Sequence, residues 1–190
     1  MRPTKFGVGQ SVRRVEDVRL ITGAGRYTDD HRPEGLVHAV VVRSPHAHAR
    51  FTFGDLDAAR AMPGVLLVLT HADVAHLGAL PCLGTVRNSD GSRMKTPPYP
   101  VLCADTVRHV GDAVAFVVAE TELQARAAAE AVEIDWEPRD ATVGIAGAEQ
   151  AGAPLVWSEI PGNLAFDSHV GDPAKTDRAF ERADRVVSLT

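Results

Sequence analysis

The stretch DAVAFVVAETELQARAAAEAVEIDWEP, Asp112–Pro138, decides the fold class of this chain. It opens with a short apolar run rich in Val and Ala, which is typical of a buried strand. Thr121 then offers an N-cap to an alanine-rich stretch of good helix formers that runs to Val132. Ile134 and Trp136 follow at alternate positions, as in a strand with one buried face. The order strand, helix, strand predicts a βαβ-like unit within a mixed α and β fold.

Toward the N-terminus, three further runs predict strands, and two short helical segments are predicted beside them. The first helical segment is capped by Asp55 or Asp57 and ended by Pro63-Gly64. The strands are Leu36–Arg43 (LVHAVVVR), Arg50–Leu56 (RFTFGDL) and Val65–Thr70 (VLLVLT), of which the first and third are predicted to be buried, and the helical segments lie in Asp55–Gly64 and His71–Gly78.

The rest of the chain alternates between loops and short elements. Residues 78–100 carry many Gly, Pro, Asn and Asp residues and predict a long loop, of a kind that is functional, partner-contacting or disordered. Residues 141–163 are rich in Ala, Gly and Pro and are interpreted as a linker or a loosely packed excursion. Asn163–Asp172 predicts the start of a strand, and Asp172–Asp184 a short amphipathic helix with Pro173 near its first position. Arg185–Thr190 predicts a strand with an unpaired edge, so we expect the natural sequence to continue.

Length and composition bound the class of protein. The 190 residues suffice for one domain and part of a second. A net charge of −5, with no basic stripe to neutralise phosphates, disfavours nucleic-acid binding. No apolar run approaches the roughly 20 residues of a membrane span and no signal peptide is evident, so we expect a cytoplasmic protein that does not contact a membrane. Cys82 and Cys103 are too few for a disulfide framework and are interpreted as small buried hydrophobes.

Eight histidines are the first candidates for chemistry. His46 and His48 lie two apart and would share one face of extended backbone, a spacing that can bind a metal. Because no third ligand is evident nearby, the favoured interpretation is that these imidazoles satisfy backbone groups or an interface. His71 and His76 are interpreted as surface residues, and His109 as structural.

Two glycine-rich stretches are candidates for phosphate-binding loops. GAGRYT, Gly23–Thr28, begins like a dinucleotide fingerprint, but it lacks the third glycine and is not predicted to join a strand to a helix. GVGQS, Gly7–Ser11, is a weaker match. Phosphate binding is therefore disfavoured at both.

Acidic residues cluster in three places. The pair Asp29-Asp30 follows a turn and is expected to cap or close it. The second pair, Glu16-Asp17, has no opposed partner. The third set consists of Glu133, Asp135 and Glu137 and is predicted to be the solvated face of an edge strand. None of the three clusters therefore marks acid–base catalysis.

Six longer strings follow one another over nearly the whole chain. They are GQSVRRVEDVRLITGAGRYTDD (Gly9–Asp30), LVHAVVVRSPHAHARF (Leu36–Phe51), MPGVLLVLTHADV (Met62–Val74), VRHVGDAVAFVVAET (Val107–Thr121), AAEAVEIDWEP (Ala128–Pro138) and GDPAKTDRAFERADRVV (Gly171–Val187). Together they resemble the N-terminal α/β hammerhead region of the molybdenum-binding large subunit of the xanthine dehydrogenase and aldehyde oxidase family. Among its members, the bacterial carbon monoxide dehydrogenase-like large subunits are most similar.

The resemblance implies an α+β fold: an α/β hammerhead domain, with a mixed sheet and a few helices, and a short start of a molybdenum-binding domain. It places an N-terminal arm at residues 1–19 and the hammerhead domain at residues 20–139. Residues 140–190 would be a linker and the incomplete start of the first molybdenum-binding domain.

The resemblance also implies a function for the parent protein. That oxidoreductase would hydroxylate an aldehyde, an N-heterocycle or CO with water as the oxygen source. It would use molybdopterin of the cytosine dinucleotide type, with 2Fe-2S clusters and FAD on partner subunits. The family's cofactor and active-site motifs lie downstream of the matched region, so no catalytic, cofactor-binding or metal residue is assigned here, and this chain alone is not expected to be catalytic.

The expected role of the chain itself is structural. It would frame the substrate channel and dock the remainder of its own large subunit and the iron–sulfur and FAD-binding subunits. The alternative is a freestanding hammerhead scaffold that binds a partner or small ligand without redox chemistry.

Overall fold

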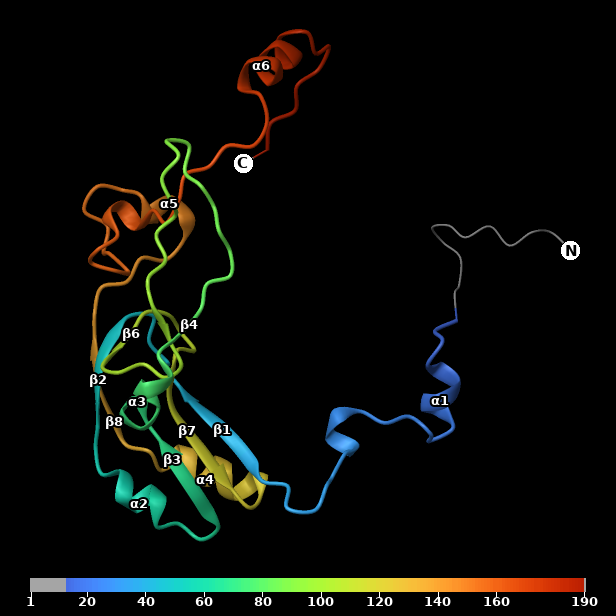
Figure 1. The fold of residues 1–190 in the computed structure, drawn as a ribbon, viewed down its shortest axis with the longest axis vertical. Helices are drawn as coiled ribbons and strands as arrows, with labels where there is room; N and C mark the ends of the chain where they lie inside the picture. The colour runs from blue at the N-terminus through green and yellow to red at the C-terminus, as the bar shows by residue number, and fades with distance from the viewer. Residues whose placement is uncertain (1–12, 190) are drawn as a thin grey trace, which may run out of the picture. The chain divides into compact units, whose positions relative to one another are not determined.

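The structure is a computed structural model that describes residues 13–189 (Figure 1). The chain separates into two units, Met1–Val37 and His38–Thr190. The described part of the first unit contains helix α1 (Asp17–Ile21) and the 3₁₀ turn η1 (Thr28–Asp30), and none of its residues is buried. The fold that carries the core therefore belongs to the second unit.

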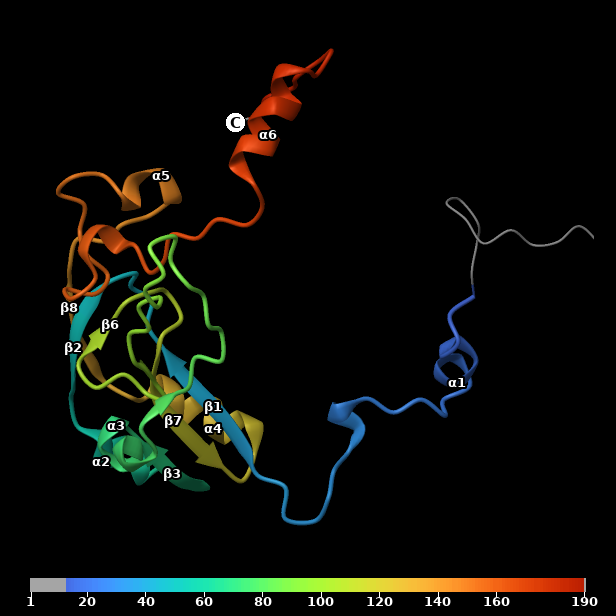
Figure 2. The same cartoon turned by 45° about the horizontal axis from the view of Figure 1, so that its top comes forward.

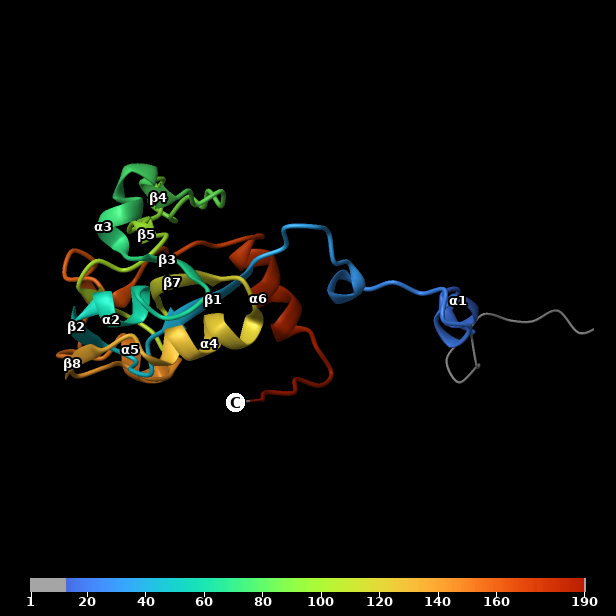
Figure 3. The same ribbon diagram turned by 90° about the horizontal axis from the view of Figure 1, so that it is seen from below.

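The first sheet of the second unit has the strand order β1-β7-β3, with every pairing antiparallel. Its strands are β1 (His38–Arg43), β7 (Ala113–Ala119) and β3 (Val65–Leu69). Helix α4 (Glu122–Glu130) lies along one side of this sheet (Figure 3), where its buried Ala125 and Ala128 allow close approach. The predicted N-cap is confirmed, because the Thr121 hydroxyl accepts a hydrogen bond from the Gln124 N–H at 3.3 Å.

The second sheet has the order β6-β2-β8 and is also antiparallel (Figure 2). Its strands are β6 (Thr106–Val107), β2 (Ala49–Phe53) and β8 (Ile134–Pro138). A buried cluster joins this sheet to the first through Val114 of β7, and it consists of Ala49, Phe51, Cys103, Val107 and Val114. Ile134 and Trp136 pack against it from one face of β8, as their alternation predicts.

The predicted βαβ unit is wrong. Helix α4 leads from β7 in the first sheet to β8 in the second, so the two strands are not parallel neighbours. The physical reason is that β7 already has a hydrogen-bonded strand on each side, so β8 pairs with β2 instead. The prediction of a mixed α and β fold with a few helices is confirmed.

Strand β3 is less buried than its sequence predicts. Val68 is 4% exposed, whereas Leu66 and Leu67 are 49% and 51% exposed. Strand β3 lies at the edge of its sheet, and α4 covers only one of the two faces.

The short helices follow the sequence signals. Helix α2 (Leu56–Arg60) is capped by Asp55, whose carboxylate accepts from the Asp57 N–H at 2.8 Å, so the first of the two proposed caps is confirmed. The predicted turn after β3 is α3 (His71–Val74) followed by η2 (Ala75–Leu77). Within the described residues, no helix is both long and apolar enough to cross a membrane.

The predicted loop at residues 78–100 is closed at its base by β4 (Ala79–Leu80), which pairs with β5 (Tyr99–Pro100). The later elements are short: α5 (Ile145–Ala148), the 3₁₀ turn η3 (Pro161–Asn163) and α6 (Pro173–Glu181). Helix α6 is the predicted helix, and the Asp172 carboxylate caps it.

The two strands predicted near the C-terminus are wrong over the residues that are described. Residues 164–172 and 185–189 form no strand, while Thr190 lies outside the described range. The first of these segments bonds to a loop at irregular spacing instead of to a strand. The second is exposed throughout and has no strand beside it in the described part of the chain.

Candidate functional site

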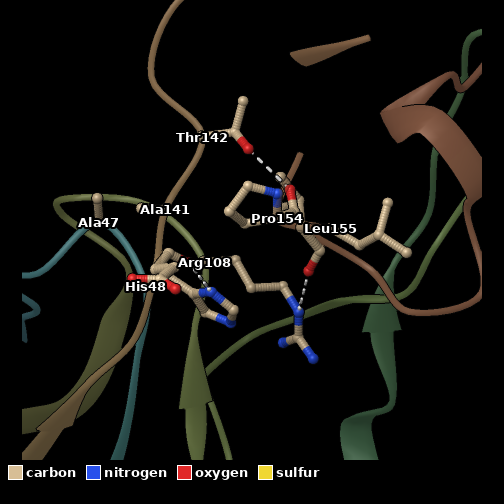
Figure 4. Close-up of a pocket in the computed structure, with 9 residues that line it drawn as sticks. Ala47, His48, Arg108, Ala141, Thr142, Pro154 and Leu155 are labelled. Carbon is tan, nitrogen blue, oxygen red and sulfur yellow. Dashed lines mark hydrogen bonds between the residues drawn. The ribbon is translucent and has the colours of Figure 1, made fainter. Parts of the chain in front are cut away.

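The main candidate site is the contact between the two-sheet core and the segment that follows β8, which we call the seam (Figure 4). A cavity of about 20 Å³ lies within it, enough for about one water molecule. The core contributes Ala47, His48 and Arg108 to its lining, and the following segment contributes Asp140, Ala141, Thr142, Pro154, Leu155 and Val156.

Arg108 makes the most direct contacts across the seam. It directly follows β6, and its Nε donates a hydrogen bond to the Val156 carbonyl at 3.2 Å. The centre of its guanidinium lies 3.7 Å from the centroid of the Trp157 ring, a distance typical of a cation–π contact. Arg108 therefore holds both the backbone and a side chain of the following segment.

Asp112 fixes the turn from which Arg108 projects. Its side chain is almost fully buried and accepts hydrogen bonds from the backbone N–H groups of Arg108 at 2.6 Å and His109 at 3.2 Å. The His109 Nε2 lies 2.9 Å from the other carboxylate oxygen, and its Nδ1 lies 3.0 Å from the Val110 carbonyl. His109 thus has the structural role that the sequence suggested, whereas Asp112 was not singled out from the sequence.

His46 and His48 diverge, because the backbone between β1 and β2 turns instead of running extended. The His48 Nδ1 bonds to the Asp140 carbonyl at 2.9 Å, while the His46 ring packs against Trp136 with centroids 5.3 Å apart. The interpretation that these imidazoles satisfy backbone groups is confirmed for His48. Over residues 13–189, no three His, Cys, Asp or Glu side chains are grouped to hold a metal ion.

Asn163 organises the far side of the seam. It has a φ of 54°, a left-handed conformation that Asn tolerates better than most residues. Its amide Nδ2 donates to the carbonyls of Ala148 at 2.9 Å and Pro154 at 3.1 Å, and its Oδ1 accepts from the Val156 N–H at 2.8 Å. The Thr142 hydroxyl also donates to Pro154, at 2.7 Å. The sequence signal for this role is the Pro-Gly-Asn turn, which sequence reasoning missed.

The tip of loop 78–100 contacts a later segment of the same chain. The Ser89 N–H donates to the Asp167 carbonyl at 2.8 Å, and the Lys95 N–H donates to the Ala165 carbonyl at 2.9 Å. The tip of this loop is therefore held by hydrogen bonds to a later segment of the same chain. Contact of the loop with partner subunits remains a prediction.

The two cysteines differ. Cys103 is buried, and its burial together with the nearby Asp112 carboxylate raises the pKa of the thiol to about 11. The thiol is thus protonated near neutral pH and behaves as the small hydrophobe that was predicted. The same prediction is wrong for Cys82, which is exposed because it lies in the long loop.

His71 and His76 differ in their exposure to solvent. His76 is exposed, as predicted, but His71 is only partly exposed and bonds through Nδ1 to the Leu102 carbonyl at 2.8 Å. The surface interpretation of His71 is therefore wrong, because the segment after β5 passes close to α3.

The acidic residues have local roles. Asp30 accepts from the Tyr27 N–H at 2.9 Å, so the expected closing of a turn is confirmed for that residue. Glu16 and Asp17 begin α1, where Glu16 makes no side-chain cap bond. The third set is exposed on the edge strand β8 and just before it, as predicted: Glu133, Asp135 and Glu137.

The glycine-rich stretch Gly23–Thr28 follows α1 and leads into a 3₁₀ turn, so it does not join a strand to a helix. The stretch Gly7–Ser11 lies outside the described residues.

Comparison with known proteins shows the family of this chain. The family described as "Aldehyde oxidase and xanthine dehydrogenase, a/b hammerhead domain" matches residues 22–140. The chain belongs to this family. Residues 22–140 include both sheets and helix α4, so we refer to this region as the hammerhead domain.

Relatives match the hammerhead domain and the segment after it. The chain is 37% identical over 187 residues to the nicotine 6-hydroxylase large subunit of Paenarthrobacter nicotinovorans, covering 97% of this chain and 22% of the relative. It is 35% identical to the carbon monoxide dehydrogenase large chain of Afipia carboxidovorans, covering 95% of this chain and 23% of that one. The chain thus spans less than a quarter of the length of these relatives.

Solved structures of similar proteins also match most of this chain and less than a quarter of their own length. Reconstituted CO dehydrogenase from Oligotropha carboxidovorans matches with a TM-score of 0.68 and 34% identity, over 93% of this chain and 22% of that chain. Quinoline 2-oxidoreductase from Pseudomonas putida 86 matches with a TM-score of 0.64 and 39% identity, over 74% of this chain and 17% of that chain.

Neither of two hollows in the described part of the chain fits a molybdopterin cofactor. The seam cavity holds about one water molecule, which is far smaller than a pterin. An open groove elsewhere is lined by apolar and acidic side chains, where a phosphate-bearing cofactor needs cationic donors. The groove lining is Glu149, Pro161, Gly162, Leu164, Phe166, Asp167 and Ser168.

Proposed function

We propose that this chain is a structural and assembly region of a molybdenum hydroxylase large subunit. Its hammerhead domain frames the substrate channel, and the seam directs the following segment toward the molybdenum-binding part of the subunit. The observation that carries the proposal is the set of bonds across the seam: Arg108 to Val156 and Trp157, and His48 to Asp140. Bonds of this kind fix the path of a backbone and supply no nucleophile or redox group.

The names of the relatives support a scaffolding role. They refer to nicotine, carbon monoxide and quinoline, which differ in size and chemistry, yet the matched proteins share this region. A domain common to such different activities is a better candidate for a shared frame than for the part that selects the substrate.

The rest of the proposal concerns the whole protein. The parent enzyme hydroxylates an aldehyde, an N-heterocycle or CO with water as the oxygen source. It carries molybdopterin of the cytosine dinucleotide type on the remainder of the large subunit, and its partner subunits carry 2Fe-2S clusters and FAD. We place the assembled enzyme in the cytoplasm. One relative is named as a molybdenum-binding subunit, which supports the metal.

Metal analysis and a dye-reduction assay test the proposal. We expect the purified chain of 190 residues to hold no stoichiometric molybdenum and to reduce no dye with aldehydes or CO. Molybdenum at one atom per chain together with dye reduction would refute a purely structural role. A reading frame that ends at Thr190 would favour the freestanding scaffold instead.

A further inference from the structure

The first sheet is apolar on both faces, although α4 lies along only one of them. Residues that pair directly across an antiparallel ladder point to the same side of the sheet. Val117 and Val68 are paired and belong to the core cluster on the α4 side. The residues next to them in the strands therefore point away from α4. They form what we call the open face: Ala39, Val41, Leu67, Leu69, Phe116 and Val118.

The pairings confirm that these six residues share one face. Val118 is paired with Ala39 on one side and Leu67 on the other. Phe116 is paired in the same way with Val41 and Leu69.

Only one end of the open face is covered. Val114 points to the same side by alternation along β7, and it is fully buried against Cys103 and Val107. Toward the other end of the sheet, Leu67 is 51% exposed and Ala39 is exposed. The other four members of the open face, Val41, Leu69, Phe116 and Val118, are half-buried. Figure 3 shows α4 on one side of the sheet and α3, β4 and β5 on the other. The open face is thus the continuation of an interior that residues 38–189 complete only in part.

An antiparallel sheet with one face in water alternates apolar and polar side chains. The open face has no polar or charged residue among its six members. This composition resembles an obligate interface, which is like a core cut in half, more than a transient one. An apolar surface of this kind marks a contact that residues 38–189 do not make among themselves.

We propose that an apolar segment of the same large-subunit polypeptide permanently covers the open face, from the part of the subunit that this chain does not span. The inference rests on the proposed function. Three observations favour this occupant: the relatives are more than four times as long as the matched region, the open face is wholly apolar, and it continues the chain's own core.

Thiol labelling of the complete large subunit and of the 190-residue chain tests the proposal. Cys82→Ser removes the exposed native thiol, and Cys103 is too buried to react. Leu67→Cys then reports on the open face, and Glu130→Cys, an exposed charged position of α4, is the matched control. A maleimide is the probe. Ala39→Cys replaces Leu67→Cys if that variant does not fold.

We expect both thiols to be labelled rapidly in the 190-residue chain. In the complete subunit, labelling of Leu67→Cys should be slower by about 100-fold or more, since it then requires local opening, while Glu130→Cys stays fast. Equal labelling of both thiols in the complete subunit would overturn the inference and leave the proposed function intact.

Other occupants give different results. Protection of Leu67→Cys in the 190-residue chain would overturn the inference: if it rises with protein concentration, a second copy covers the open face, and if it does not, another part of the same chain does. Protection that appears only after the companion subunits are added would assign it to one of them, with the same consequence. A gene that encodes no longer subunit would refute the proposed function and this inference together.

Discussion

The hammerhead core and the segment at residues 140–169 are held by different interactions. In the core, Val107, Val114 and Val117 are completely buried, and the strands form two hydrogen-bonded sheets. In the segment, all of which is described, Ile160 is the one buried residue. The segment is held instead by single bonds from side chains such as Arg108 and Asn163 to the backbone.

This difference determines how each region responds to change. Burial of apolar area gives the core its stability, so damage there affects the whole unit. The segment belongs to the low-stability end of the structure, where few buried contacts resist local opening. Its path can therefore change without cost to the core, as the proposed connection to a molybdenum-binding domain requires. Substitutions in the two regions should therefore differ in their effect on stability.

Phe51→Ala should have the largest effect. The Phe51 ring is 3% exposed and packs against Phe53 and Trp136 at centroid distances of 5.4 Å. The cavity left by its removal should lower the free energy of unfolding by about 3–5 kcal/mol, measured by urea denaturation. The matched control is Phe166→Ala in the later segment, where the residue is 46% exposed and the loss should be smaller, about 1–2 kcal/mol. Equal losses at the two positions would contradict the division.

Asp112→Ala should have the next largest effect. It removes the acceptor of two backbone N–H groups, those of Arg108 and His109, from a buried position. We expect a loss of about 2–3 kcal/mol in thermal or urea unfolding, since unsatisfied buried donors are costly. Asp112→Asn keeps one acceptor oxygen and should recover part of this loss. Full stability of the alanine variant would show that water replaces the carboxylate.

Arg108→Ala should loosen the segment with little effect on the core. The variant loses the bond to Val156 and the contact with Trp157. We expect a loss of about 1 kcal/mol or less in global stability, but faster proteolysis between residues 141 and 163 and a change in Trp157 fluorescence. The control is Arg50→Ala, which removes an exposed 3.8 Å ion pair with Asp105. Unchanged proteolysis would contradict the assigned role of Arg108.

Ionisation of the Cys103 thiol should have the smallest effect, because it changes the free energy of unfolding only at alkaline pH. Its pKa is raised from 9.0 to about 11 in the folded chain, chiefly by burial. The folded state therefore holds the proton more tightly than the unfolded state. The resulting stability is fully present below pH 9 and is lost as the pH rises toward 11.

The check is urea unfolding of the chain at several pH values between 8 and 11. Cys103→Ala should reduce the fall in stability over this range, whereas Cys82→Ser, at an exposed thiol, should not. An identical fall in all three proteins would show that Cys103 does not titrate as inferred.

Much of the fold could be predicted from local pattern. Thr121 was predicted as a helix cap, and Asp55 as one of two candidate caps with Asp57, because capping depends on neighbouring residues alone. The alternation of Ile134 and Trp136 predicted which face of β8 is buried. Pairing of strands was not predictable in this way, because it depends on which edges are free; β7 had none left for β8.

The candidate site was largely missed for the same reason. Arg108 and Trp157 are far apart in the sequence, and neither lies in a motif, so no local signal links them. His48 was considered as a possible metal ligand, but its partner is the backbone carbonyl of Asp140. Because every residue has a backbone carbonyl, the sequence gives no sign of this contact.

The sequence by itself determined the family, the mixed α and β class and the positions of the principal strands and helices. These follow from ordered strings, periodicity and capping, which are properties of neighbouring residues. Tertiary structure decided the antiparallel order of both sheets, the bonds across the seam and the bare side of the first sheet. The reason is physical: a strand run such as VLLVL shows that both of its faces are apolar, but only the assembled fold shows which of the two faces α4 covers.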